Sequence, residues 1–147
     1  MSVLSDEHLR FLQTMKVARL ATCGDEKPFP KPHCVPVCYA YAEGLIWIAI
    51  DEKPKSGRPL RRLRNIETNP HVALTVDHYE DDWSRLAYLI VEGQAVQQPL
   101  SQKAREALLE RYAQYRSMRL ESAVVIKPQR AIFWRFSPEP TCSSEGS

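Results

Sequence analysis

Positive charge gathers in one short segment, KPKSGRPLRRLR, between Lys53 and Arg64. It holds six of the twenty Lys and Arg residues, although the formal net charge of the chain is only +2. For a helix over about Pro59 to Thr68, the spacing of about 100° per residue predicts an apolar stripe and an opposite polar face. The stripe consists of Leu60, Leu63 and Ile66, and the polar face consists of Arg58, Arg61, Arg62 and Asn65. At least three guanidinium groups could then bind one anion, because the planar fork of arginine donates two parallel hydrogen bonds to phosphate.

The residues before this helix favour the same interpretation. Lys53 and Lys55 add charge, and Ser56 and Gly57 lie close to the helix N-terminus, where free backbone N–H groups attract anions. A solvated helix face is the main alternative, since most charge runs are solvated. Nucleic-acid binding is a further alternative, but the low overall charge and the acidic segment DHYEDD argue against it.

An anion site alone does not account for tight binding. Three arginines contribute about 5 kcal/mol, whereas micromolar binding needs about 8 kcal/mol. The remainder must come from apolar burial, and the expected strand from His33 to Ala42 offers a surface for it. One face of that strand carries only small residues, namely Cys34, Pro36, Cys38, Ala40 and Ala42. Either a packed helix or a ligand ring could cover this face, and a phosphate joined to a flat ring describes a flavin-type cofactor.

The elements that must position these residues are mostly strands. Runs of β-branched and aromatic residues predict strands at Val17–Cys23, His33–Ala42, Leu45–Ile50, His71–Val76, Arg85–Val96, SAVVIK (122–127) and RAIFWRF (130–136). Helices are expected from Ser5 to about Lys16, from Pro59 to Thr68, and from Ser101 to about Arg116. Since parallel strands would need more crossover helices, this pattern predicts a mainly β, antiparallel barrel with peripheral helices. We expect a single domain over residues 1–136 and a disordered tail over residues 137–147.

Several functional classes find no support in the sequence. The four cysteines form no CxxC pair and the four histidines are scattered, so neither a metal site nor a disulfide framework is expected. No Ser/His/Asp or Cys/His arrangement indicates a nucleophile. Asp6, Glu7 and Arg10 interrupt the N-terminus where a secretory signal would be apolar, and the longest apolar run, Leu45–Ile50, is too short to cross a bilayer. We therefore expect a cytoplasmic protein that does not bind membranes.

Four segments resemble the pyridoxamine 5'-phosphate oxidase-like family of flavin and deazaflavin oxidoreductases. They are VARLAT, PHCVPVCYAY, LRRLRNIETNPHVALTVDHYEDDWS and VEGQAV, and together they cover most of the chain up to about Val96. The resemblance is strongest to the branch assigned as dependent on coenzyme F420, a deazaflavin. It implies a split β-barrel of the FMN-binding type and a homodimer with cofactor sites at the subunit interface.

The resemblance also implies which residues bind the cofactor. Those expected at the cofactor phosphate are Arg62 and, around it, Lys55, Arg58 and Arg61. Those expected to face the ring system through backbone groups are Val35, Pro36 and Val37. Two residues would reach the site from a loop, Trp83 and Ser84. No catalytic acid is assigned, because in such enzymes the cofactor supplies the reactive carbon and the protein supplies orientation and shielding from water.

The function expected from this resemblance is hydride transfer between F420 and a small organic substrate, with FMN as the alternative cofactor. The longer acidic tail of F420 would favour the extra charges at Lys53, Lys55 and Arg58. A non-catalytic module of the same fold that carries a flavin, F420 or haem is the second hypothesis. Nucleic-acid binding by a small basic barrel is the third.

Overall fold

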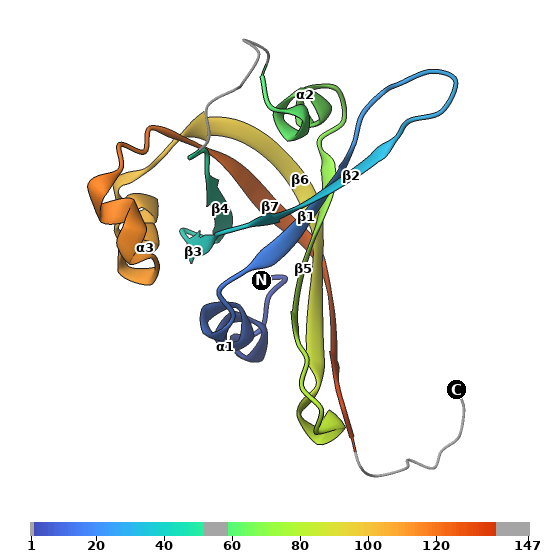
Figure 1. Ribbon diagram of the computed structural model, residues 1–147, viewed down its shortest axis with the longest axis vertical. Helices are drawn as coiled ribbons and strands as arrows, with labels where there is room; N and C mark the ends of the chain where they lie inside the picture. The colour runs from blue at the N-terminus through green and yellow to red at the C-terminus, as the bar shows by residue number, and fades with distance from the viewer. Residues whose placement is uncertain (1, 52–58, 138–147) are drawn as a thin grey trace.

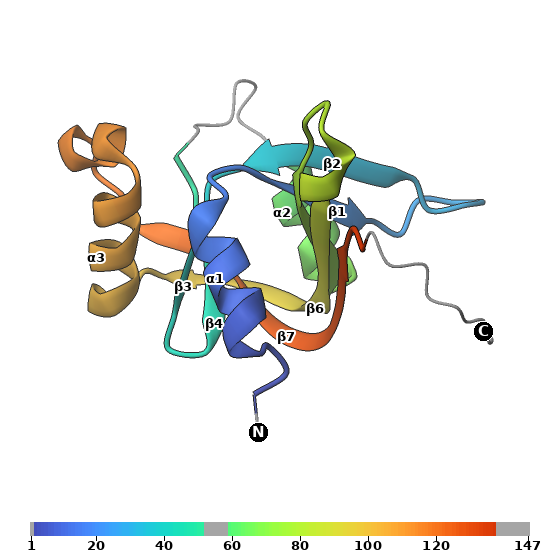
Figure 2. The same cartoon turned by 90° about the horizontal axis from the view of Figure 1, so that it is seen from below.

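The computed structural model describes residues 2–51 and 59–137. In this part of the chain seven antiparallel strands form one sheet with the order β2-β1-β5-β6-β7-β4-β3. The strands are β1 (Ala18–Cys23), β2 (Pro32–Val37), β3 (Ala40–Ala42), β4 (Leu45–Ala49), β5 (His71–His78), β6 (Ala87–Pro99) and β7 (Ser122–Arg135). The helical elements are α1 (Asp6–Thr14), α2 (Arg61–Thr68), α3 (Gln102–Arg111) and the 3-10 turns η1 (Trp83–Arg85) and η2 (Ala113–Ser117). The sheet curls and the helices lie around it (Figures 1 and 2), so the predicted split barrel with peripheral helices is confirmed.

The two longest strands, β6 and β7, join the two halves of the sheet. The first part of β6 pairs with β5 and the first part of β7 pairs with β4, while β6 and β7 pair with each other along their lengths. Their register shifts between Glu92 and Gly93. An added Cβ at Gly93 would lie 2.2 Å from the carbonyl oxygen of Lys127, so only glycine allows the two backbones to approach this closely.

The main core lies inside the curl of the sheet. Leu20, Leu74 and Leu89 are completely buried there, each on a different strand. Helix α1 adds Phe11 and Leu12 to the same cluster and so covers one side of the core. Because successive strand residues alternate between the two faces of a sheet, the residues that neighbour these leucines in the strands face the outside of the sheet.

The expected strand from His33 to Ala42 is divided in two, because Tyr39 turns inward between β2 and β3. Tyr39 is only 1% exposed, and its hydroxyl oxygen lies 2.6 Å from the carbonyl oxygen of Leu12 and 2.8 Å from that of Met15. The break also divides the small face. Helix α3 covers the part around Ala40, whereas Pro36 remains exposed. The helix that was predicted as one cover of this face is therefore present around Ala40, and the part around Pro36 is open to a ligand.

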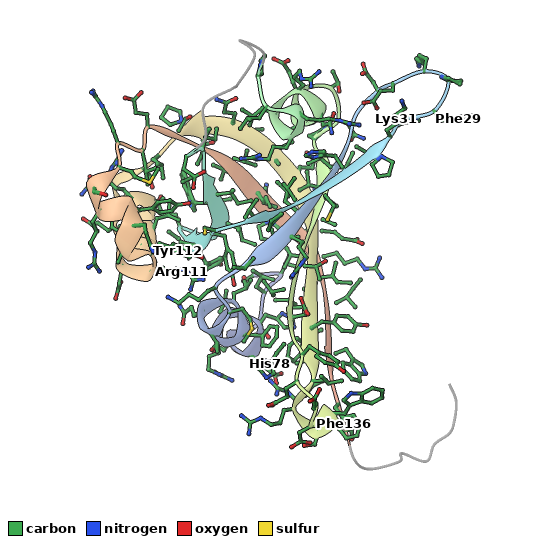
Figure 3. The ribbon with its side chains drawn as sticks, in the orientation of Figure 1. Phe29, Lys31, His78, Arg111, Tyr112 and Phe136 are labelled. Carbon is green, nitrogen blue, oxygen red and sulfur yellow. The ribbon has the colours of Figure 1, made fainter. Side chains whose placement is uncertain are left out.

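Arg111, the last residue of α3, connects this helix to α1 and β3 (Figure 3). Its guanidinium donates hydrogen bonds to the carbonyl oxygens of Gln13 at 2.9 Å, Met15 at 2.6 Å and Tyr39 at 2.8 Å. It also lies 4.7 Å from the ring centroid of Tyr39. Since Gln13 lies in the last turn of α1 and Met15 directly follows that helix, the positive charge meets the negative end of α1.

Other element boundaries differ from the predicted ones by short stretches. Helix α1 ends at Thr14 and α2 begins at Arg61, while the expected third helix ends at Arg111 and is followed by the separate turn η2. The two closing strands form one strand, β7, because Pro128 lies opposite Gly93 at the register shift and does not interrupt the pairing. Apart from residue 137, the predicted C-terminal tail lies outside the described residues. None of the helices in the described ranges has both the length and the apolar character that a membrane span requires.

Candidate functional site

A cavity of about 170 Å³ lies where β2, β4, α2 and η2 meet. Arg62 of α2 lines it together with Pro36 and Val37 of β2. The remaining lining residues are Val17, Cys38, Ile48, Ala49, Asp51 and Tyr115. The structure therefore places one arginine of the basic segment beside the strand that was expected to hold a ligand ring.

Arg62 reaches this cavity because α2 rests on β1 through its polar side. The Asn65 side-chain amide donates a hydrogen bond to the Thr22 hydroxyl at 3.0 Å, and both side chains are buried. Arg62 lies one turn before Asn65 and is only 7% exposed. The predicted division of α2 into a buried apolar stripe and an outward polar face is therefore wrong in part, since Arg62 and Asn65 are buried together with Ile66.

Arg61 points to a different place from Arg62. Its guanidinium lies 3.3 Å from a carboxylate oxygen of Glu26, in the loop between β1 and β2. The backbone N–H of Lys31 donates to the other carboxylate oxygen of Glu26 at 2.9 Å, and this bond, helped by the charge of Arg61, holds the pKa of Glu26 below its usual value. Arg61 does not line the cavity with Arg62. Lys55 and Arg58, the other two residues expected at a phosphate, lie outside the described residues.

His33 is a further residue of this region, and sequence reasoning gave it no role. It lies opposite Thr22 in the β1–β2 ladder, so its side chain is on the face that α2 covers. Burial lowers the pKa of His33, and the positive charges of Arg61 and Arg62 lower it further. The imidazole is therefore uncharged at neutral pH. Its buried Nδ1 atom has no hydrogen-bond partner among the residues that the structure describes.

The wall opposite Arg62 contains a pair that the sequence did not reveal. The hydroxyl of Tyr115, in η2, donates a hydrogen bond to a carboxylate oxygen of Asp51 at 2.6 Å. Burial and this hydrogen bond both raise the pKa of Tyr115, so the phenol stays protonated and fixes the position of the carboxylate. The cavity consequently has a guanidinium on one side and a carboxylate acceptor on another. Asp51 directly follows the strand LIWIAI, but its partner is 64 residues away in the chain.

Val35, Trp83 and Ser84 lie outside the cavity. Val35 packs against the main core. Trp83, 60% exposed, and Ser84 belong to η1, at the far end of the β5–β6 hairpin from α2 (Figure 1). Asp82 fixes this turn by accepting hydrogen bonds from the Ser84 backbone N–H at 3.1 Å and hydroxyl at 2.7 Å. Within one chain these residues cannot contact a ligand held by Arg62.

The outer face of the sheet is partly apolar. The rings of Tyr88 and Trp134 stack there with centroids 5.6 Å apart, and Ile90 pairs with Ile132 in the row next to them. Two exposed ion pairs also join neighbouring strands of the sheet, between Arg19 and Asp77 at 3.2 Å and between Arg130 and Glu92 at 3.6 Å. Pro36 lies in this face, opposite Arg19 in the ladder. The cavity is thus next to an exposed surface of substantial apolar character.

A model of the family described as pyridoxamine 5'-phosphate oxidase matches residues 4–135 of the chain. No curated protein matches it. Among solved structures, a conserved hypothetical protein from Mycobacterium tuberculosis is 23% identical, with a TM-score of 0.70 over 99% of this chain and 95% of the other. An FAD-binding protein from Mycobacterium smegmatis is 18% identical, with a TM-score of 0.62 and coverage of 91% and 98%. The haem storage protein HutZ from Vibrio cholerae is 17% identical, with a TM-score of 0.64 and coverage of 92% and 95%. At these identities the similarity establishes a common fold.

Proposed function

Since the chain belongs to the pyridoxamine 5'-phosphate oxidase family, we propose that it is an oxidoreductase that binds a flavin-type cofactor, with the anionic end of that cofactor on Arg62. The observation that supports this most is the cavity that Arg62 shares with Pro36 and Val37. The planar guanidinium of Arg62 could donate two parallel hydrogen bonds to a phosphate at this wall, which makes a phosphate a favourable ligand there. The structurally similar FAD-binding protein from M. smegmatis supports a flavin-type ligand.

The strand β2 suits the ring system of such a cofactor. It is the terminal strand of the sheet, so its backbone N–H and C=O groups on the side away from β1 are not used in the ladder. A flavin or deazaflavin ring carries donors and acceptors along its edge that could pair with them. Val37 and Pro36 would contact the ring, whereas Val35, which packs into the core, would contribute through its backbone alone.

The size of the cavity supports a site that two chains complete. Its volume of about 170 Å³ is smaller than the roughly 300–1,000 Å³ of usual small-molecule pockets. We therefore propose a homodimer that uses the outer sheet face, where Tyr88 and Trp134 are exposed. In this arrangement Trp83 and Ser84 of one subunit would contact the cofactor bound to its partner, as the resemblance implies.

F420 is the preferred cofactor and FMN the alternative. The acidic tail of F420 is longer than that of FMN and would favour the positive residues between Lys53 and Arg64. When bound, the cofactor supplies the carbon that accepts or donates a hydride. The chain would bind the phosphate through Arg62 and exclude water from the ring with β2. Asp51, held in position by Tyr115, would accept a hydrogen bond from a hydroxyl of the cofactor or its substrate.

A carrier of flavin or haem without turnover is the second candidate. The similarity to the haem storage protein of V. cholerae favours it. The two candidates differ in steady-state turnover, which is measured by reducing quinone, enone and nitro compounds with the reduced cofactor. Turnover of any of them supports the enzyme, and cofactor binding without turnover supports the carrier. Retention on DNA or RNA that weakens steeply with salt would instead favour the nucleic-acid binder.

The proposal is tested by titrating FMN and F420 into wild-type protein and into Arg62→Gln and Arg62→Lys variants. A hydrogen-bonded charged group contributes about 1.5–3 kcal/mol, so Arg62→Gln should weaken binding about 10- to 150-fold. Arg62→Lys keeps the charge and should lose less. Arg119→Gln is the matched control, because the Arg119 side chain is 90% exposed and pairs with Glu121 away from the cavity. Unchanged affinity in a folded Arg62→Gln variant would show that the phosphate is bound elsewhere.

A further inference from the structure

A second concave surface, separate from the Arg62 cavity, lies between α1, η1 and the end of β7. Its volume is about 510 Å³, within the usual range for a small-molecule site. Figure 3 shows His78, one of its lining residues, between α1 and the β5–β6 hairpin. This groove shares no lining residue with the cavity at Arg62.

Three arginines from separate elements line this groove: Arg10 of α1, Arg85 of η1 and Arg135 of β7. Their bonds within the chain use only part of their donor capacity. The Nε atom of Arg85 lies 2.8 Å from the carboxylate of Glu80, and that of Arg135 lies 3.7 Å from the carboxylate of Glu7. Arg10 forms no ion pair with the other residues that the structure describes. The terminal nitrogens of these guanidinium groups are therefore free to bind an anion.

The balance of charge around the groove indicates the charge of its ligand. Glu7 lines the groove together with the three arginines, whereas Glu80 and Asp82 lie beside Arg85 outside this lining. His78 lies 3.5 Å from Glu80 and would share that carboxylate with Arg85. Within the lining itself three guanidinium groups face one carboxylate, so an anionic ligand is favoured, and a single negative charge limits repulsion from Glu7.

The inner side of the groove is apolar. Phe11 lies there, 8% exposed, with its ring centroid 5.5 Å from that of Phe133. Met15 and Ala87 extend this surface. Because an inorganic anion would gain nothing from these side chains, the groove suits a molecule that carries both a charge and an apolar body.

We propose that this groove binds a small organic monoanion, in which a carboxylate contacts Arg10 and Arg85 and an apolar or aromatic body packs on Phe11 and Met15. Arginine is suited to this role, since its fork matches the two oxygens of a carboxylate. The groove includes Ser84, which the proposed function assigns to the cofactor of the partner subunit, but the two proposals are tested on different residues, Arg10 and Arg85 here and Arg62 there.

The experiment uses 2-naphthoate as the probe and 2-naphthamide as its uncharged counterpart. Binding of each to the full chain is followed by calorimetry and by amide chemical shifts of Arg10, Phe11 and Ser84. We expect 2-naphthoate to bind at least ten-fold more tightly than 2-naphthamide, and Arg10→Gln and Arg85→Gln each to weaken 2-naphthoate about ten-fold. Both arginines are exposed, so neither change should unfold the protein.

Two controls separate this site from others. Arg119→Gln, which removes an exposed arginine elsewhere, should leave 2-naphthoate binding unchanged. Arg62→Gln should also leave it unchanged, even if it abolishes cofactor binding, so the two proposals can fail independently. Equal affinity for 2-naphthoate and 2-naphthamide, equal losses in all the arginine variants, or no binding by the wild type up to about 10 mM, equivalent to less than about 3 kcal/mol, would each overturn the proposal.

Discussion

Replacing Arg111 by methionine should destabilise the protein strongly, although this residue lies outside both proposed sites. The side chain of methionine keeps the apolar stem of arginine and removes the guanidinium. Three carbonyl oxygens then lose a charged donor: those of Gln13, Met15 and Tyr39, which lie 2.9, 2.6 and 2.8 Å from the guanidinium nitrogens. The stacking of the charge on the ring of Tyr39 at 4.7 Å is lost as well.

The magnitude follows from how much water can replace the guanidinium. Hydrogen bonds to a charged donor contribute about 1.5–3 kcal/mol each. The carbonyl of Gln13 is at the surface and would be rehydrated, so its loss costs little. Those of Tyr39 and Met15 are partly buried and would be poorly rehydrated. We therefore expect the free energy of unfolding to fall by about 3 kcal/mol, which corresponds to a melting temperature lower by roughly 6–12 °C for a chain of this length.

The assay is urea denaturation of the wild type and of Arg111→Met, with Arg119→Met as the control for loss of an exposed charge. A lower midpoint with an unchanged slope would report a change in stability alone. The control should differ from the wild type by less than about 0.5 kcal/mol, because its ion pair with Glu121 lies at the surface and is exposed to water. A loss below about 1 kcal/mol in Arg111→Met would refute the view that Arg111 joins α3 to the end of α1 and to Tyr39 through partly buried hydrogen bonds.

Two further predictions concern the sheet and the region beneath α2. Gly93→Ala should lower the free energy of unfolding by about 1–3 kcal/mol or more, because the added Cβ would lie 2.2 Å from the carbonyl oxygen of Lys127. Thermal or chemical denaturation measures this change. An unchanged free energy of unfolding would contradict the close approach of β6 and β7. Because the folded pKa of His33 lies below its unfolded value of about 6.5, the unfolded chain binds more protons in acid. The wild type should therefore lose stability relative to His33→Gln as the pH falls below about 6.5, and parallel stability curves for the two proteins between pH 5 and 8 would contradict this assignment.

The order of elements and the class of fold could be predicted because they depend on local patterns. Alternation of residue types along VARLAT and HVALTV identifies these segments as strands, whichever strands they pair with. Ser5 and Ser101 cap their helices as expected. The position of Arg62 beside Pro36 and Val37 came from the resemblance rather than from periodicity. Helical periodicity alone placed Arg62 on an outward face, because it assumes that a helix has one buried side. Helix α2 instead contacts the protein on two sides, through Ile66 and through Asn65.

The parts that could not be predicted are those that depend on pairing between distant segments. The Tyr115–Asp51 hydrogen bond requires η2 to pack beside the end of β4. The pairing of Ala49 in β4 with Ala123 in β7 brings these two segments together. Likewise, the strand break at Tyr39 depends on acceptors in α1, which local β propensity does not register. No short segment of the sequence contains both partners of such a contact, so local patterns could not predict it.

The arginines of this chain show why residue type alone does not identify a functional site. Arg111 donates hydrogen bonds to main-chain carbonyl oxygens and so connects α3 to the end of α1 and to Tyr39. Arg61 and Arg19 pair with single carboxylates at the surface, where such pairs contribute little. Arg62 is buried at the wall of a cavity, and Arg10, Arg85 and Arg135 surround a groove with more donors than the chain itself occupies. Lining a concave surface makes a cationic side chain a candidate for ligand binding, and Arg62 and the three arginines of the groove meet this condition; Arg111 and Arg64 also line concave surfaces, so the condition does not by itself identify a site.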